Sequence, residues 1–391
     1  MLKSVEGSRA VAEVVTLCRP DVVSAYPITP QTLIVEDLAE MVANGVLKAE
    51  YVNVESEHSA ASVVLGSSAT GARTYTATTS QGLLLMIEVL YNIAGLRLPV
   101  VMGGVNRAVS APINIWNDCQ DSVAARDSGW IQLYAEDNQE ACDLHIQAYK
   151  IAEREDIQLP VMVCMDGFLI THSIEPVDIP SQDDVDRFLA PYRPNHYLTP
   201  KKPLTFGYLM GPDGYMETRY LMQDAMEKAK GVIEDVAKEF SKSFGRYNGG
   251  LVEGYRLDDA EVAFVSMGTA VGVIKETVDI LREEGVKAGA LKIRSYRPFP
   301  EEAIRETLQG VKRVAVIEKD ISLGFSGALC SDIKAAILGS GYDVEIKGFI
   351  AGLGGREINQ NTVRQALSLF EEGKEPIFLD LAESVKGRKH A

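Results

Sequence analysis

Cysteine is scarce in this chain, and no two cysteines lie close together in the sequence. The five among 391 residues are Cys18, Cys119, Cys142, Cys164 and Cys330. Because no pair has CxxC or other metal-ligand spacing, we expect this chain to hold neither a zinc ion nor an iron–sulfur cluster. Scattered thiols in odd number are typical of the reducing cytoplasm, where we expect the protein to be. Four lie in apolar, core-like segments, whereas Cys119 lies in a polar loop and is expected to be accessible.

The chain also has fewer basic than acidic residues, and it has no long apolar run. Lysine and arginine number 39 against 55 aspartates and glutamates, so the net charge is −16. Nucleic-acid phosphates and anionic membrane surfaces both attract clustered cations, so neither is an expected partner. No apolar run reaches the roughly 20 residues that a membrane-spanning helix needs, and we recognise no signal peptide.

The sequence does contain a regular alternation of strand-like and helix-like segments. Its length exceeds what one core usually serves, so we expect two domains. The first, residues 1–250, has predicted strands at 22–25, 50–54, 74–78, 100–103 and 161–165. It includes an extended, proline-rich excursion over 175–215 and a charged helix over 216–242. The second, residues 251–391, repeats the alternation. This pattern predicts an α/β fold with two doubly wound domains and mostly parallel sheets.

Polar segments follow four of the predicted strands. They are Tyr-Pro-Ile-Thr-Pro-Gln-Thr at 26–32, Glu-Ser-Glu-His-Ser-Ala-Ala at 55–61, Thr-Ala-Thr-Thr-Ser-Gln-Gly at 76–82, and the segment 106–118, which begins Asn-Arg-Ala-Val. The carboxyl ends of parallel strands meet at one edge of an open sheet, where ligands bind. Pro27 and Pro30 favour extended geometry in the residues before them, so Thr29 is presented at this edge. Taken alone, the first segment is as well explained as a proline-stiffened connection.

Together and in this order, the four segments resemble the α subunit of the pyruvate:ferredoxin oxidoreductases, a thiamine-diphosphate-dependent family. The resemblance extends from Pro27 to the segment Ala-Gly-Leu-Gly-Gly at 351–355. It implies a domain that binds the pyrimidine side of thiamine diphosphate, followed by a domain like the C-terminal domain of transketolases.

The resemblance also implies roles for individual residues. Thiamine chemistry requires a carboxylate that shares a proton with N1′ of the aminopyrimidine, and the resemblance assigns this role to Glu57. It assigns Arg107 and Thr29 to the substrate carboxylate, which a guanidinium can bind through two parallel hydrogen bonds. The expected coenzyme contacts come from Glu57, Pro27, Ile28 and Gln81.

Each of these residues has a structural alternative. Glu57 would also suit the dipole of a helix that begins there. Arg107 would also suit an ion pair with Asp118 or Asp121. The Thr29 hydroxyl can stabilise a turn, and helix capping explains the segment around Gln81 almost as well.

The motif with which thiamine enzymes bind the diphosphate through Mg²⁺, Gly-Asp-Gly followed by an asparagine, is not found in the sequence. We therefore expect no metal on this chain and only half of an active site. In the resembled family, a β subunit holds the diphosphate half and a [4Fe–4S] cluster. A γ subunit and a ferredoxin-like δ subunit with further clusters complete the complex.

The activity that the resemblance implies converts pyruvate, coenzyme A and oxidised ferredoxin into acetyl-CoA, carbon dioxide and reduced ferredoxin. 2-Oxoisovalerate and 2-oxoglutarate are alternative substrates, because a methylene provides only about 1–3 kcal/mol of discrimination. Two other classes remain open: a non-catalytic subunit that organises its partner chains, and a self-sufficient transketolase-like enzyme.

Overall fold

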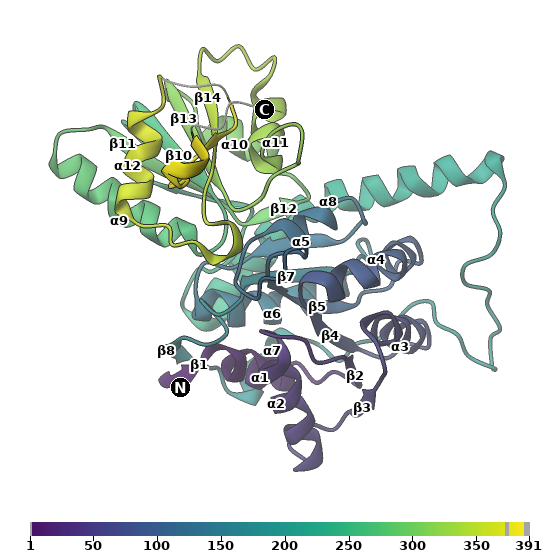
Figure 1. Ribbon diagram of the computed structural model, residues 1–391. Coiled ribbons are helices and arrows are strands. Elements are labelled where there is room, and N and C mark those ends of the chain that lie inside the picture. Colours follow the sequence, from purple (N-terminus) through teal and green to yellow (C-terminus); the bar gives the residue numbers. More distant parts are fainter. Residues whose placement is uncertain (1, 372–374, 387–391) are drawn as a thin grey trace.

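The computed structural model describes residues 2–371 and 375–386, in which the strands form two large sheets with helices packed on both faces (Figure 1). The first sheet has the order β12-β6-β7-β5-β4-β2-β3, and all its neighbours are parallel except β12 and β6. The second has the order β15-β14-β13-β10-β11-β9, in which β9 alone is antiparallel to its neighbour. This confirms the predicted α/β fold with two mostly parallel sheets.

The first sheet is built around strands that are buried along their whole length. Its strands are β2 (Val22–Ala25), β3 (Glu50–Asn53), β4 (Thr74–Thr78), β5 (Val101–Asn106), β6 (Ile131–Tyr134), β7 (Val161–Asp166) and β12 (Ser295–Arg297). Its helices are α1 (Gly7–Leu17), α2 (Thr32–Ala43), α3 (Glu57–Ala69), α4 (Ser80–Gly95), α5 (Gln120–Ala124) and α6 (Asn138–Ala152). Helices α1, α2 and α6 pack on one face, and α3, α4 and α5 on the other.

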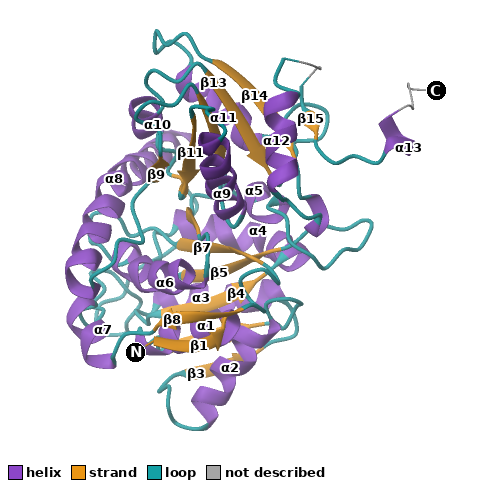
Figure 2. Cartoon of the chain, turned by 90° about the vertical axis from the view of Figure 1, so that its left-hand side faces the viewer, coloured by secondary structure: helices purple, strands orange, loops and turns teal. Residues whose placement is uncertain are grey.

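The second sheet stacks beyond the first (Figure 2). Its strands are β9 (Val252–Tyr255), β10 (Val262–Ser266), β11 (Ala288–Ile293), β13 (Arg313–Glu318), β14 (Glu345–Ile350) and β15 (Ile377–Phe378). The helices that accompany it are α9 (Ala270–Glu283), α10 (Glu301–Thr307), α11 (Ala328–Ile337), α12 (Gln360–Ser368) and α13 (Glu383–Lys386), with a 3₁₀ turn at Leu353–Gly355. The apolar core under α3 and α4 continues into this sheet through Tyr134, Tyr296 and Leu291.

Two segments differ from the sequence-based expectation. The strand β12 follows β11 in the chain, yet it pairs with β6 of the first sheet, so residues beyond 250 complete that sheet. Tyr296 of β12 is fully buried there, with its ring edge-on to that of Tyr134 at a centroid distance of 6.1 Å. Local periodicity predicted neither β6 nor β12, which pair with each other although about 160 positions separate them in the sequence.

The excursion over 175–215 is also more regular than predicted. It contains most of β8 (Ile174–Asp178), which pairs with β1 (Leu2–Glu6), and α7 (Gln182–Phe188). The long helix α8 (Pro212–Phe244) contains the predicted helix 216–242, and its first turns project away from the body of the molecule (Figure 1). Within the described residues, no helix is both long enough and apolar enough to cross a membrane.

Candidate active site

Glu57 is the first residue of α3, at the carboxyl edge of the first sheet. Ser56 caps the helix, since its hydroxyl accepts the Ser59 backbone N–H at 3.2 Å. The Glu57 residue is only 7% exposed, and among the described residues its carboxylate has no hydrogen-bond or ion-pair partner. It lies against Gly82 of α4: a Cβ added to that glycine would be 2.7 Å from Oε1 of Glu57. A buried carboxylate without a protein partner, next to a residue without a side chain, fits a group that binds a ligand.

The loop over 26–31 is held at this edge by a glutamine that the sequence did not single out. Gln31 is fully buried; its Nε2 donates to the Ala77 carbonyl at 2.8 Å, and its Oε1 accepts the Ile28 N–H at 3.2 Å. The loop therefore presents Pro27 and Thr29 as exposed residues, with Ile28 half-buried. No local pattern reveals the bond from Gln31 to the sheet, because Ala77 is 46 positions away.

Arg107 follows β5 and reaches the same loop. Its Nη1 donates to the Thr29 carbonyl at 2.8 Å and its Nε to the Asn114 carbonyl at 2.9 Å. Burial lowers the pKa of Arg107, although the charge of Asp121 opposes this. The guanidinium forms no ion pair with Asp118 or Asp121 in the described residues; Asp121 accepts the backbone N–H of Arg107 instead. The salt-bridge interpretation of Arg107 is therefore wrong, and Nη2 is left without a protein partner in the part of the chain that the structure describes.

Gln81, in the first turn of α4, points toward the segment that follows β5. Its side-chain amide donates to the Ser110 hydroxyl. The structure thus gathers all six predicted residues along one sheet edge, on the ends of four neighbouring parallel strands.

The second sheet supports the segment that carries Arg107. Asn114 donates from Nδ2 to the Gly354 carbonyl at 3.0 Å, and Gly354 returns its N–H to Asp118 at 3.0 Å. The predicted accessibility of Cys119 is wrong for this reason: its thiol is fully buried, and burial raises its pKa well above the ordinary value. Its N–H donates to the Lys319 carbonyl at 2.8 Å, so the loop is covered by a segment far away in the sequence.

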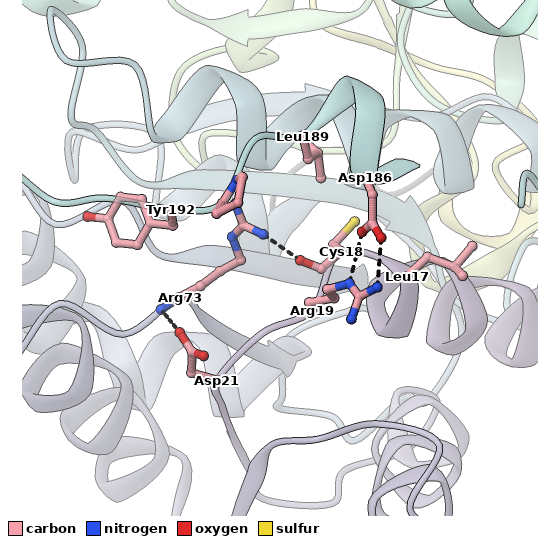
Figure 3. Close-up of a pocket in the computed structure, with 9 residues that line it drawn as sticks. Leu17, Cys18, Arg19, Asp21, Arg73, Asp186, Leu189 and Tyr192 are labelled. Atoms are coloured by element: carbon pink, nitrogen blue, oxygen red, sulfur yellow. Dashed lines mark hydrogen bonds and ion pairs between the residues drawn. The ribbon is translucent and has the colours of Figure 1, made fainter. Parts of the chain in front are cut away.

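A separate cavity of about 490 Å³ lies at the opposite edge of the first sheet (Figure 3). Asp21 and Arg73 line it, and each immediately precedes a strand. Arg73 is neutralised by Glu153 at 2.6 Å, and Arg19 by Asp186 at 2.7 Å. With both of these cations already paired, neither offers a free positive charge to a ligand in this cavity. In the residues described, no three histidine, cysteine, aspartate or glutamate side chains cluster as a metal site would require.

Comparison with known proteins agrees with this geometry. Residues 13–238 match the family described as pyruvate flavodoxin/ferredoxin oxidoreductase, thiamine diP-bdg, and residues 260–363 match the pyruvate:ferredoxin oxidoreductase core domain II. The pyruvate synthase subunit PorA of Methanocaldococcus jannaschii is 53% identical, over 96% of this chain and 96% of that protein. The ketoisovalerate oxidoreductase subunit VorA of Pyrococcus horikoshii is 44% identical, over 96% of this chain and 94% of its own. The chain belongs to the pyruvate:ferredoxin oxidoreductase family, whose members are oxidoreductases.

Solved structures support the fold. The 2-oxoglutarate:ferredoxin oxidoreductase from Magnetococcus marinus aligns with a TM-score of 0.72 at 20% identity, over 94% of this chain and 65% of that longer chain. A split-gene transketolase aligns with a TM-score of 0.57 at 13% identity, over 94% and 98%. At such identities the likeness concerns the fold alone, and it agrees with the predicted transketolase-like architecture.

Proposed function

We propose that this chain is the α subunit of a pyruvate:ferredoxin oxidoreductase, which converts pyruvate and coenzyme A to acetyl-CoA and carbon dioxide and passes electrons to ferredoxin. The observation that carries the proposal is the Glu57 carboxylate, buried at the sheet edge without a protein partner and facing Gly82. The high identity to PorA subunits along nearly the whole chain supports the same activity.

In this proposal, some residues at the sheet edge bind the coenzyme and others bind the substrate. Thiamine diphosphate, when bound, supplies the electron sink that lets the carboxylate of a 2-oxoacid leave as carbon dioxide. Glu57 would hold a proton at N1′ of the pyrimidine, and Pro27, Ile28 and Gln81 would line that ring. Arg107, with Nη2 still available, would bind the substrate carboxylate beside Thr29, whose carbonyl already orients the guanidinium.

The remaining parts of the site belong to partner chains in this proposal. Mg²⁺, the diphosphate and a [4Fe–4S] cluster are assigned to a β subunit. Further subunits, γ and a ferredoxin-like δ, would pass the electrons to ferredoxin in the cytoplasm. We keep the domain boundary near residue 250, although β12 crosses back to the first sheet.

Substitution of Glu57 by glutamine tests the proposal in the assembled complex. Because general acid–base groups contribute roughly 10²–10⁴-fold, E57Q should lower pyruvate-dependent ferredoxin reduction by at least about 100-fold. Glu55 is exposed in the segment just before α3, so E55Q should keep nearly the wild-type rate. Unchanged turnover in E57Q would make this chain an assembly subunit. Equal rates on pyruvate and 2-oxoisovalerate, the alternative that the VorA relative raises, would overturn the choice of substrate.

A further inference from the structure

Asp121 is a buried carboxylate that accepts four hydrogen bonds. It lies in α5 and is 1% exposed. One oxygen, Oδ2, accepts the backbone N–H of Ser80 at 2.8 Å and that of Arg107 at 3.0 Å. The other, Oδ1, accepts from Asn106 Nδ2 at 2.9 Å and from the Ser122 N–H at 2.7 Å.

The two donors on Oδ2 come from the ends of neighbouring strands. Ser80 follows β4 and Arg107 follows β5, so a single oxygen fixes the backbone at both places. Ser80 has a φ of +49°, in the left-handed region that a non-glycine residue adopts only when its surroundings hold it there. Its N–H bond to Asp121 and its hydroxyl bond to the Ala108 carbonyl supply that restraint.

Burial and hydrogen bonding act on the charge of Asp121 in opposite directions. The charged or titratable groups that face it are Arg107 just after β5, Asp118 on the following loop and Cys164 on β7. Burial raises the pKa of Asp121 to about 7, while the hydrogen bonds from Asn106, Ser80 and Arg107 oppose that rise. Because all four partners are donors, only the ionised carboxylate can satisfy every one of them.

We propose that Asp121 is the positioning residue of this site: its carboxylate locks the ends of β4 and β5 together, and so sets Gln81 and Arg107 for coenzyme and substrate. The carboxylate itself touches neither. The roles of Gln81 and Arg107 rest on the proposed function, whereas the coupling of the two strand ends rests on the contacts alone.

The variant D121A tests this, because alanine offers none of the four donors an acceptor at this position. Amide hydrogen exchange at Ser80 and Arg107 should accelerate by about tenfold or more, and KM for pyruvate in the assembled complex should rise by a similar factor. Asp143→Ala is the matched control, since Asp143 is also fully buried but bonds to Arg246, Asn248 and Gln139. It should change neither quantity.

A double variant provides the rescue. In N106D/D121N the amide at 121 can donate to the new carboxylate at 106, which frees its oxygen for Ser80 and Arg107. We expect this variant to recover most of the lost exchange protection and of the KM, which a general loss of stability would not allow.

Several results would overturn the proposal. Unchanged amide exchange at Ser80 and Arg107 in D121A refutes the coupling without reference to any activity. If exchange accelerates but KM for pyruvate stays at the wild-type value, the positioning role is refuted. A wild-type complex that turns over no 2-oxoacid refutes the proposed function instead and leaves the exchange result standing. If D121A does not fold, N106D/D121N decides: it should keep the wild-type exchange rates at Ser80 and Arg107 and the wild-type KM, and loss of both contradicts the role.

Discussion

At the scale of single residues, Gly82 is the position in the site that should tolerate a larger side chain least. An added Cβ would lie 2.7 Å from Glu57 Oε1 and 2.6 Å from Thr78 Oγ1, closer than such contacts allow. G82A should therefore displace the Glu57 carboxylate and lower kcat by at least about tenfold. Stability should change little, because alanine favours a helix over glycine by about 1 kcal/mol.

The matched control lies on the same helix. A Cβ at Gly95 would meet nothing within 4 Å, so G95A should keep full activity and share the gain in helix propensity. Steady-state rates and melting temperatures of the two variants decide the matter. Equal kcat in G82A and G95A would show that the position of the Glu57 carboxylate does not matter.

Residues whose place in the fold can be recognised from the local sequence could be predicted. Glu57, Thr29 and Arg107 each follow a strand, and the ends of parallel strands meet, so their gathering at one edge followed from the chain alone. Gln31 and Asp121 could not be found in this way, because each acts on partners that only the folded sheet brings near. Their exact roles in turnover remain predictions.

At the scale of elements, the 3₁₀ turn at Leu353–Gly355 supports the loop that orients Arg107. Gly355 has a φ of +80°, and a Cβ there would be 2.3 Å from the Trp116 Cβ. G355A should therefore push the loop, move Asn114 away from the guanidinium and raise KM for pyruvate by roughly tenfold. Enzyme kinetics of the assembled complex measures this.

Gly285 separates this effect from backbone strain. Its φ is +87°, but a Cβ there would contact nothing within 4 Å. G285A should lose stability by about 1 kcal/mol, as a left-handed alanine does, and keep its KM. A KM that rises equally in both variants would mean that strain, and not support of the loop, is responsible.

Elements with a clear local sequence pattern were predictable, whereas strands that depend on a distant partner were not. The strand β7 is apolar, and β4 alternates threonine with tyrosine and alanine, so both were found from the sequence. By contrast, β8 forms because it pairs with β1 at the other end of the first domain. The strand β12 forms because Tyr296 is buried against Tyr134. Such pairings depend on tertiary contacts that no local window contains.

At the scale of the whole molecule, the two sheets are joined by buried charges as well as by the shared core. Lys292 of β11 and Arg294 contact Glu140 of α6 at 2.7 Å and 2.6 Å. Nothing in the spacing of these residues predicted the cluster, because each would ordinarily be assigned to the surface. Their burial became possible only where opposite charges from two domains meet.

This cluster makes a prediction about acid stability. Burial alone would raise the pKa of Glu140, but Arg294 and Lys292 outweigh it and hold that pKa at about 2. Since the unfolded value is about 4.3, the stabilisation is complete above that pH and is lost as the pH falls towards 2. E140Q should lower the free energy of unfolding at pH 7 by about 3–5 kcal/mol and flatten its dependence on pH between about 4 and 2. Denaturant unfolding across this range measures both effects.

E284Q, which breaks an exposed ion pair with Arg364, should leave the unfolding midpoint nearly unchanged. If E140Q were as stable as the wild type, or kept its acid dependence, the buried cluster would not help to join the sheets.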